Sequence, residues 1–377
     1  MARAAAFAPA MGRRYTDTRN YDFGPADRSN VSALSPHVRH RLITEEELAR
    51  TALSAHSFDA GEKFLQEVFW RTYWKGWLEL RPSVWAQYQV ARDDWFTVLG
   101  KDRAVRAAYD EAIAGNTSID CFDAWAQELA EHGYLHNHAR MWFASIWIFT
   151  LGLPWELGAD FFLTHLMDGD AASNTLSWRW VAGLQTSGKT YLARPSNIEK
   201  FTKGRFAPEA ASLAVQAPAV AGLENPPAGD MPISAALPGG DYALLLHEDD
   251  CAFETLALPR APAKVYVQAA PTQRGRQPLS QAAAAFTQGA LDDTAARAAA
   301  HFACPVERSS PEALARDLPL YASYAPTGPF RDMAEKHRAA IHWIIRPIDG
   351  FLWPFATKGF FKFKSAIPKA LDALGLR

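Results

Sequence analysis

The spacing of the apolar residues changes twice along this chain of 377 residues and divides it into three parts. Between about residues 35 and 201 the apolar residues recur mostly at helical spacing, with few alternating β-branched runs. From 207 to 240 the chain is rich in Ala, Pro and Gly and offers little apolar surface to bury. Beyond this stretch, short apolar runs alternate with helical patterns, which is typical of a parallel sheet. The sequence therefore predicts a mainly α protein, in which an all-helical domain precedes a small α/β domain.

These changes set the expected boundaries. We expect a disordered tail over 1–14, a helical domain over 15–206, a linker over 207–240, and an α/β domain over 241–377 that ends in a segment rich in aromatics and lysines. The tail lacks the continuous apolar run of a signal peptide. The most apolar run, residues 141–155, is shorter than the roughly 20 residues that a membrane crossing needs. We therefore expect a cytoplasmic protein that has no membrane contact.

Individual elements can be placed from the same patterns. The helices expected in the first domain are Thr44–His56, Asp59–Leu80, Arg103–Ala114, Cys121–His132, Asn137–Leu151 and Pro154–Asn174. In the second domain we expect strands at Tyr242–His247, Lys264–Gln268, Leu318–Ala325 and Ile341–Arg346, and helices at Leu279–Phe302 and Pro329–Ala340. The segment from Phe351 to Leu376 is interpreted as a docking helix against the helical domain in preference to a membrane or nucleic-acid contact.

Composition excludes some classes of function. The three cysteines, Cys121, Cys251 and Cys304, are far apart, which argues against disulfides, a zinc site and an iron–sulfur cluster. The net charge of −2 gives no overall attraction to nucleic acid, so a DNA site would have to be a local patch. Thirteen tryptophans are many for this length, and crowded indoles are suited to electron transfer or to stacking on bases.

Two short motifs carry most of the functional information. Residues 168–174 read Asp-Gly-Asp-Ala-Ala-Ser-Asn and are followed by Trp178-Arg-Trp180, while residues 136–141 read His-Asn-His-Ala-Arg-Met. On a helix, Asp170, Asn174 and Trp178 would share one face, and so would Asn137, Arg140 and Met141. Two polar faces of this kind predict a shared ligand.

The motifs resemble the flavin pocket of the photolyase/cryptochrome family, in which MHN-x-x-RM faces DGD-x-x-x-N followed by W-x-W. Two further segments resemble that family. Ser32-Ala-Leu34-Ser35-Pro is similar to its T-S-x-L-S-P element, with Val31 in place of the first Thr, and residues 64–71, FLQEVFWR, are similar to its W-L-N-E-L-x-W-R helix. The resemblance covers roughly residues 15–206 and places an α/β domain after the flavin domain, where the family has it before. The sequence leaves open whether this is a permuted relative of the family's domain or an unrelated addition.

The resemblance implies FAD as the cofactor and does not identify an antenna chromophore. The implied FAD-binding residues are Tyr21, Ser32, Leu34, Ser35, Phe64, Glu67, Arg71, Asn137, Arg140, Asp168, Asp170 and Asn174. Among these, Arg140 is expected to pair with Asp168, and Asn174 would face flavin N5. A neutral amide there favours the reduced anionic flavin, and Asn is typical of photolyases at this position, whereas plant-type cryptochromes carry Asp.

Other residues are implied to face a DNA lesion or to carry electrons. Glu67, Trp70, Asn137, Met141 and Trp180 match lesion-contacting positions. Trp178 and Trp155 match the inner members of the family's tryptophan chain, with Trp95 as the candidate for the outermost member. Asn137 stands where the (6-4) branch needs a His, which favours cyclobutane dimers as the substrate.

The implied function is light-driven DNA repair, in which a deoxyribodipyrimidine photolyase-like lyase splits cyclobutane pyrimidine dimers by electron transfer from excited FADH⁻. The partner would be UV-damaged DNA, single- or double-stranded, and the protein is expected to be a monomer. The alternative is a cryptochrome-like blue-light photoreceptor that uses the same FAD pocket for signalling.

Three patterns suggest other sites, and we reject each of them. Residues 183–190, GLQTSGKT, fit the Walker A pattern, but a P-loop needs a strand before it and a helix after it, and Pro195 follows within six residues. His136 and His138 are two residues apart, so a helix would point them to different sides and no metal site is expected. Glu248-Asp-Asp250 is interpreted as an exposed acidic turn after a strand.

Overall fold

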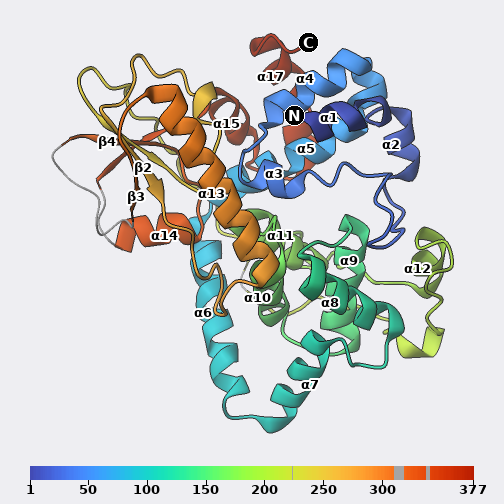
Figure 1. Cartoon of the computed structure of the whole chain (residues 1–377). Helices are drawn as coiled ribbons and strands as arrows, with labels where there is room; N and C mark the ends of the chain where they lie inside the picture. Colours follow the sequence, from blue (N-terminus) through green and yellow to red (C-terminus); the bar gives the residue numbers. More distant parts are fainter. Residues whose placement is uncertain (223, 310–317, 337–339) are drawn as a thin grey trace.

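The computed structural model describes residues 1–222, 224–309, 318–336 and 340–377 (Figure 1). The expected fold class is confirmed: a helical domain comes first, and a five-stranded parallel sheet follows it. Most of the predicted elements are present within a few residues of their expected bounds. The last residues of the helix expected over Pro329–Ala340 fall outside the described residues.

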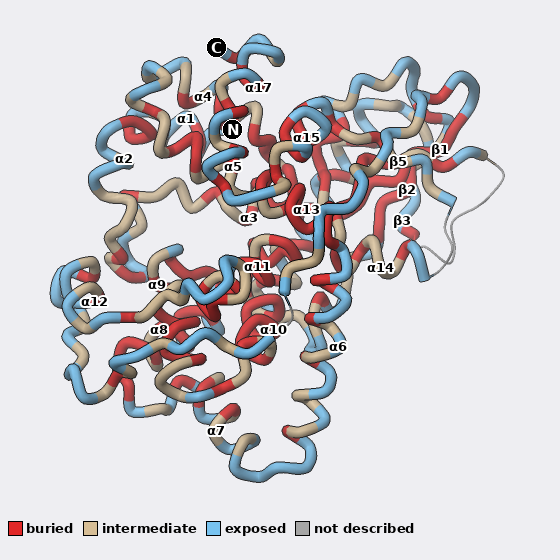
Figure 2. The backbone as a smooth tube through the Cα atoms, turned by 180° about the vertical axis from the view of Figure 1, so that it is seen from behind, coloured by how far each residue is buried: buried red, intermediate tan, exposed pale blue. Residues whose placement is uncertain are grey.

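The helical domain contains α3 (Ser35–Arg39), α4 (Glu45–Ala55), α5 (Phe58–Glu79), α6 (Pro82–Leu99), α7 (Arg103–Ala114), α8 (Asp120–His132), α9 (Asn137–Ser145), α10 (Trp155–His165), α11 (Ala171–Val181) and α12 (Pro195–Phe201). A π-helical turn, Ile146–Thr150, extends α9. Figure 2 shows that the chain is buried along α10 and α11, which lie in the core.

Pro82 separates α5 from α6 and occupies the first turn of α6, where its missing N–H costs nothing. One expectation about these helices was wrong. The single helix expected over Pro154–Asn174 is two helices with a bend over residues 166–170. Asp170 causes the restart, because its side chain accepts a hydrogen bond from Ser173 N at 2.8 Å and caps α11.

The N-terminal segment is ordered, contrary to the expectation of a disordered tail. It forms α1 (Ala2–Phe7), the 3₁₀ turn Ala8–Ala10 and the start of α2 (Arg13–Thr18). Ala4 and Met11 are fully buried, and Phe7 packs on Tyr15 and Phe64. These few apolar side chains supply the surface that keeps the segment folded onto α4 and α5.

The sheet has the strand order β3-β2-β1-β4-β5, and every pairing is parallel. Its strands are β1 (Ala243–Leu246), β2 (Lys264–Gln268), β3 (Val306–Ser309), β4 (Leu320–Ser323) and β5 (Ile341–Ile344). The helices α13 (Gln281–Phe302) and α14 (Pro329–Lys336) cover opposite faces, each over its own apolar cluster. The sequence missed β3 because this edge strand, Val-Glu-Arg-Ser, carries one apolar residue.

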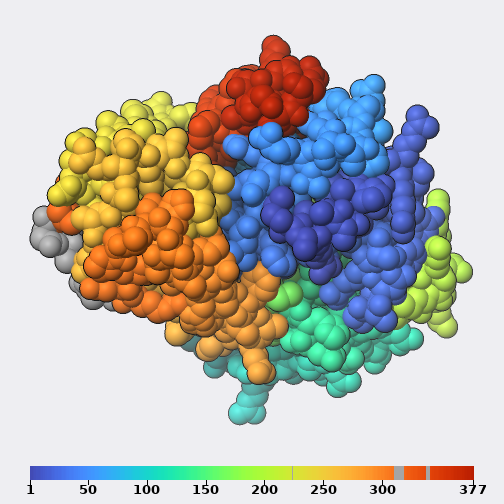
Figure 3. All heavy atoms as spheres, turned by 45° about the horizontal axis from the view of Figure 1, so that its top comes forward, coloured from blue at the N-terminus to red at the C-terminus, as the bar shows by residue number. Residues whose placement is uncertain are grey.

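The last part of the chain returns to the helical domain, as predicted for a docking element. We call residues 347–377 the C-terminal arm; it contains α15 (Pro347–Leu352), the turn Trp353–Phe355, α16 (Phe360–Lys364) and α17 (Ile367–Ala373). Its apolar side chains join the helical core. At Gly76 of α5, a Cβ atom would come within 2.6 Å of the Trp353 ring, so the close approach requires glycine. Figure 3 shows the arm as one block beside the α/β domain and the segment that contains α4 and α5.

Buried ion pairs join the two domains. Glu248 pairs with Arg39 at 3.2 Å and with Arg274 at 2.7 Å, while Asp250 pairs with Arg41 at 3.2 Å and with Arg346 at 2.6 Å. Glu248 and Asp250 are almost fully buried, so the exposed acidic turn expected here was wrong. The turn lies against Arg39, the last residue of α3, and Arg41, just after it. No local pattern predicts this contact between distant segments.

Candidate functional site

Two ion pairs bring together the elements that carry the sequence motifs. Arg140 Nη2 on α9 donates to Asp168 Oδ2 at 2.9 Å, which is the predicted pair. Arg71 on α5 pairs with Asp170. The bend before α11 is therefore held between α5 and α9.

Asp168 is a buried carboxylate, and one of its two oxygens accepts no hydrogen bond from the described residues. Its exposed fraction is 3%, and among the described residues its Oδ1 has no hydrogen-bond partner. Burial raises the pKa of Asp168, but the guanidinium groups of Arg140 and Arg71 outweigh this effect and hold the pKa below its ordinary value. The carboxylate is therefore ionised at neutral pH and retains a free acceptor.

Asn174 also presents an acceptor. Its side chain is buried on α11, and Nδ2 donates to the carbonyl of Ala159 at 2.8 Å. This bond fixes the orientation of the amide and leaves Oδ1 as the atom available to a ligand.

The remaining predicted cofactor residues lie in two places. Ser35 begins α3, and before it Ala33 adopts a left-handed conformation, with φ of 47°, while Leu34 N donates to Ser32 Oγ at 3.4 Å. Phe64 is buried against Tyr15 and Phe7. Tyr21 lies in a separate half-exposed group, with its ring 5.9 Å from Phe23 and 5.2 Å from Phe201.

The side chains that match lesion-facing positions already have contacts within the chain. Glu67 pairs with Arg19 at 2.6 Å, and Trp180 stacks on Tyr191 with ring centroids 5.5 Å apart. Trp70 stacks on Phe360 of the C-terminal arm, with centroids 3.7 Å apart and an interplanar angle of 11°. Met141 is half-buried and Asn137 is exposed. Sequence reasoning missed Arg19 and Phe360, which approach from distant segments, and Tyr191, which lies in the loop between α11 and α12.

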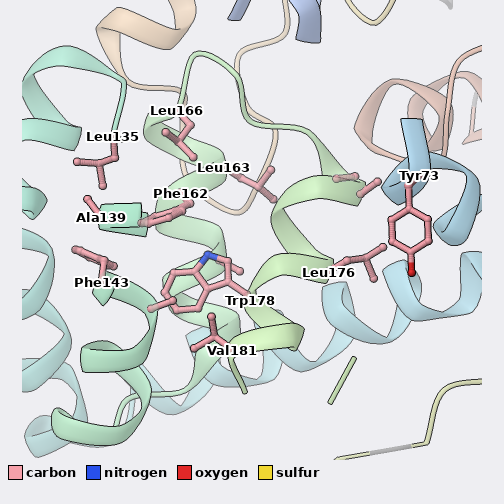
Figure 4. Close-up of a cluster of buried hydrophobic side chains, with 14 of the residues drawn as sticks. Tyr73, Leu135, Ala139, Phe143, Phe162, Leu163, Leu166, Leu176, Trp178 and Val181 are labelled. Carbon is pink, nitrogen blue, oxygen red and sulfur yellow. The ribbon is translucent and has the colours of Figure 1, made fainter. Parts of the chain in front are cut away.

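Trp178 of α11 lies in the apolar core and packs against α9 and α10 (Figure 4). A Cβ atom at Gly158 would come within 2.3 Å of its ring, so α10 needs glycine there. Its ring centroid is 5.1 Å from Phe162 and 6.2 Å from Trp147. Trp155 packs instead on Tyr88 at 5.6 Å, and the sequence did not single out Trp147 as an indole neighbour of Trp178.

His136 organises the start of α9. Its Nδ1 accepts from His138 N at 3.1 Å, and its Nε2 lies 2.9 Å from the carbonyl of Arg19. Burial lowers the pKa of His136 to about 4. Both contacts suit a neutral ring, so protonation would break the N-cap beside Asn137 and Arg140.

This depressed pKa predicts acid sensitivity. In the unfolded chain His136 takes up its proton near pH 6.5, but in the folded protein it does so only near pH 4. Stability should therefore fall as the pH drops through this window, by an amount on the order of a few kcal/mol. Urea unfolding at pH 7.0 and pH 5.0 should show a smaller loss for His136→Gln than for the unmodified protein. An equal loss in both proteins would contradict this role.

The site fits a flavin. The unused acceptors on Asp168 and Asn174 can receive N–H groups of a flavin ring, and the nearby Arg71 and Arg140 can stabilise negative charge. Asp170 also lines a small cavity of about 20 Å³, whose wall includes Arg39, Lys75 and Arg274.

The Walker A-like segment is a loop. Residues 183–190 follow α11 directly and α12 begins at Pro195, so a helix and not a strand precedes the motif. This geometry lacks the strand–loop–helix unit that a P-loop needs.

Comparison with known proteins shows what the helical domain is similar to. Residues 64–214 match the family model of the FAD binding domain of DNA photolyase. These residues are therefore similar to the FAD-binding domain of DNA photolyases. A deoxyribodipyrimidine photo-lyase of Streptomyces griseus is 35% identical over 185 residues, covering 48% of this chain and 37% of that protein. One from Synechococcus is 30% identical over 190 residues, again covering 48% of this chain and 37% of that protein. The chain thus spans well under half the length of these relatives.

Solved structures with similarity to this chain include a photolyase and a cryptochrome. A bacterial class III photolyase from Agrobacterium tumefaciens gives a TM-score of 0.43 at 27% identity, covering 53% of this chain and 41% of that one. A Synechocystis cryptochrome gives a TM-score of 0.43 at 21% identity, covering 54% of this chain and 42% of that one.

Within the described residues, no helix combines the length and apolarity that a bilayer crossing requires.

Proposed function

We propose that this protein is a light-driven DNA repair flavoprotein that splits cyclobutane pyrimidine dimers. The observation that carries the proposal is the buried group of Arg71, Arg140, Asp168, Asp170 and Asn174, which retains free acceptors inside a photolyase-type FAD-binding domain. Bound as FADH⁻, FAD would supply the light-driven electron.

The chain's own residues would hold and tune this cofactor. Asp168 and Asn174 would orient the ring through Oδ1 of each side chain, and the Arg140 pair would keep Asp168 ionised. Asn174 has no ionisable proton, so it would accept a hydrogen bond without supplying a proton. Trp178, buried on α11, would connect the site to the aromatic core.

The alternative, a blue-light photoreceptor, has one observation in its favour. Glu67 and Trp70, which match lesion-facing residues, are engaged by Arg19 and Phe360. Repair requires Glu67 to exchange its partner for a base, while signalling does not. Asn174 and Trp180 support repair, because they match photolyase positions and Trp180 offers a half-exposed indole for stacking.

A repair assay separates the two. Fully reduced protein should remove dimers from a UV-irradiated oligonucleotide under light near 400 nm and not in the dark. We expect Trp180→Ala to weaken lesion binding about tenfold, since stacking on one base is worth roughly 1–3 kcal/mol, whereas Trp180→Phe should retain most of it. Glu67→Gln should lower the repair yield per photon while leaving flavin content unchanged. If dimer loss under light equals the dark control on single- and double-stranded DNA, the photoreceptor alternative replaces repair.

A further inference from the structure

The C-terminal arm lies directly on a residue of the proposed substrate site. Phe360 stacks face to face on Trp70, and the neighbouring Tyr73 donates its hydroxyl to the carbonyl of Lys358 at 2.9 Å. Arg81 donates to the carbonyl of Thr357 at 2.9 Å. These contacts fix the loop before α16 and place α16 beside Trp70.

The arm is positively charged. Residues 350–371 contain four lysines and no acidic residue. Lys364 pairs with Glu62 at 3.0 Å, whereas Lys358 and Lys362 are exposed and form no ion pair with the described residues. Two ammonium groups are therefore available to an anionic partner next to Trp70.

An exposed aromatic side chain lies between these lysines. The rings of Phe360 and Phe363 are buried, but Phe361 is 86% exposed. Exposing a phenyl ring costs hydrophobic free energy, and a ring between cations is the arrangement that binds single strands through stacking and phosphate contacts.

We propose that the outer face of α16, formed by Lys358, Phe361 and Lys362, contacts the DNA strand next to the dimer. This inference rests on the proposed repair function, because that function places the lesion near Trp70. A strand that enters the site would pass α16, where the lysines can neutralise phosphates and Phe361 can stack on a flanking base. A membrane contact fits less well, since α16 has five residues and offers one exposed aromatic.

The test measures DNA affinity in flavin-loaded protein. Against a dimer-containing single-stranded oligonucleotide, Phe361→Ala should raise Kd about tenfold. The double variant Lys358→Ala/Lys362→Ala should flatten the plot of log affinity against log salt by about 0.7 for each lysine. Matched controls are Val90→Ala, an exposed apolar residue on α6, and Lys101→Ala, an exposed lysine just after α6. Both controls should leave affinity and salt slope unchanged.

The outcomes distinguish this inference from the proposed function. If the unmodified protein neither binds nor repairs damaged DNA, the proposed function fails. If it does both and the α16 variants match the controls, the α16 contact is wrong. Sedimentation with phosphatidylserine vesicles gives the remaining outcome: variants that lose vesicle binding but keep DNA affinity would show that this face contacts lipid.

Discussion

Replacing Arg140 by Ala will yield a protein that purifies without flavin. Arg140 donates to Asp168 Oδ2 at 2.9 Å, and Asp168 is buried. Without this guanidinium, the carboxylate must either remain charged with Arg71 as its remaining neighbouring cation or take up a proton. Removing one member of a buried pair costs about 3–5 kcal/mol. We expect FAD content, measured by absorbance at 450 nm after release from the protein, to fall at least tenfold.

A second arginine provides the control. Arg28 also lies over the Tyr134 ring and pairs with Glu128 at 3.0 Å, and its side-chain exposure of 24% is close to the 22% of Arg140. Arg28→Ala should keep its flavin. Asp168→Asn should lose less flavin than Arg140→Ala, because the charge that it leaves without a counter-ion is that of Arg140, whose side chain is 22% exposed and keeps its hydrogen bond to the carbonyl of Leu135 at 3.0 Å. Full flavin content in Arg140→Ala, with the native circular dichroism spectrum, would show that the Asp168 pair does not hold the cofactor.

The Arg140–Asp168 pair also shows what sequence can predict. Asn137, Arg140 and Met141 lie within one helix, and Asn174 and Trp178 lie within another, as helical periodicity predicts. Asp170, expected on the same helical face as Asn174, instead precedes α11 as its N-cap. The strands β1 and β2 were predicted for a similar reason, because both are short, continuous apolar runs bounded by turn residues.

The same reasoning could not predict contacts between distant segments. Arg19 reaches Glu67 across 48 residues, and Phe360 reaches Trp70 from the other end of the chain. Neither contact has a periodic signature, since each depends on how whole helices pack. The N-terminal segment was misjudged for the same cause: Met11 is buried by α4 and α5, not by its own neighbours.

The order of the domains makes one of these distant contacts important. Because the α/β domain follows the helical domain, the turn after β1 and the start of the arm both bring carboxylates to the end of α3. Arg41, just after α3, forms ion pairs with carboxylates from both segments. It donates to Glu45 at 3.3 Å, to Asp250 at 3.2 Å and to Asp349 at 2.7 Å, and it is 2% exposed.

Arg41→Met should therefore destabilise the protein more than loss of an exposed pair. The substitution keeps much of the side-chain volume but leaves Glu45 and Asp349 without their arginine, while Asp250 retains Arg346. We expect a loss of about 3–5 kcal/mol in urea unfolding at pH 7. Arg106→Ala, which removes an exposed i, i+4 pair with Asp110, should cost about 0.5 kcal/mol or less.

The pH dependence of this loss tests its electrostatic origin. Burial already raises the pKa of Asp349 even with Arg41 beside it. Without Arg41, the folded-state pKa of Asp349 should rise further above that of the unfolded chain. The pKa of Glu45, which Arg41 now holds below its ordinary value, should rise as well, so folding will bind protons. The stability deficit of Arg41→Met should then shrink from pH 7 to pH 5, because protonation removes the unpaired charge. A deficit that is equal at both pH values would show that Arg41 stabilises the domain junction by packing and not by charge.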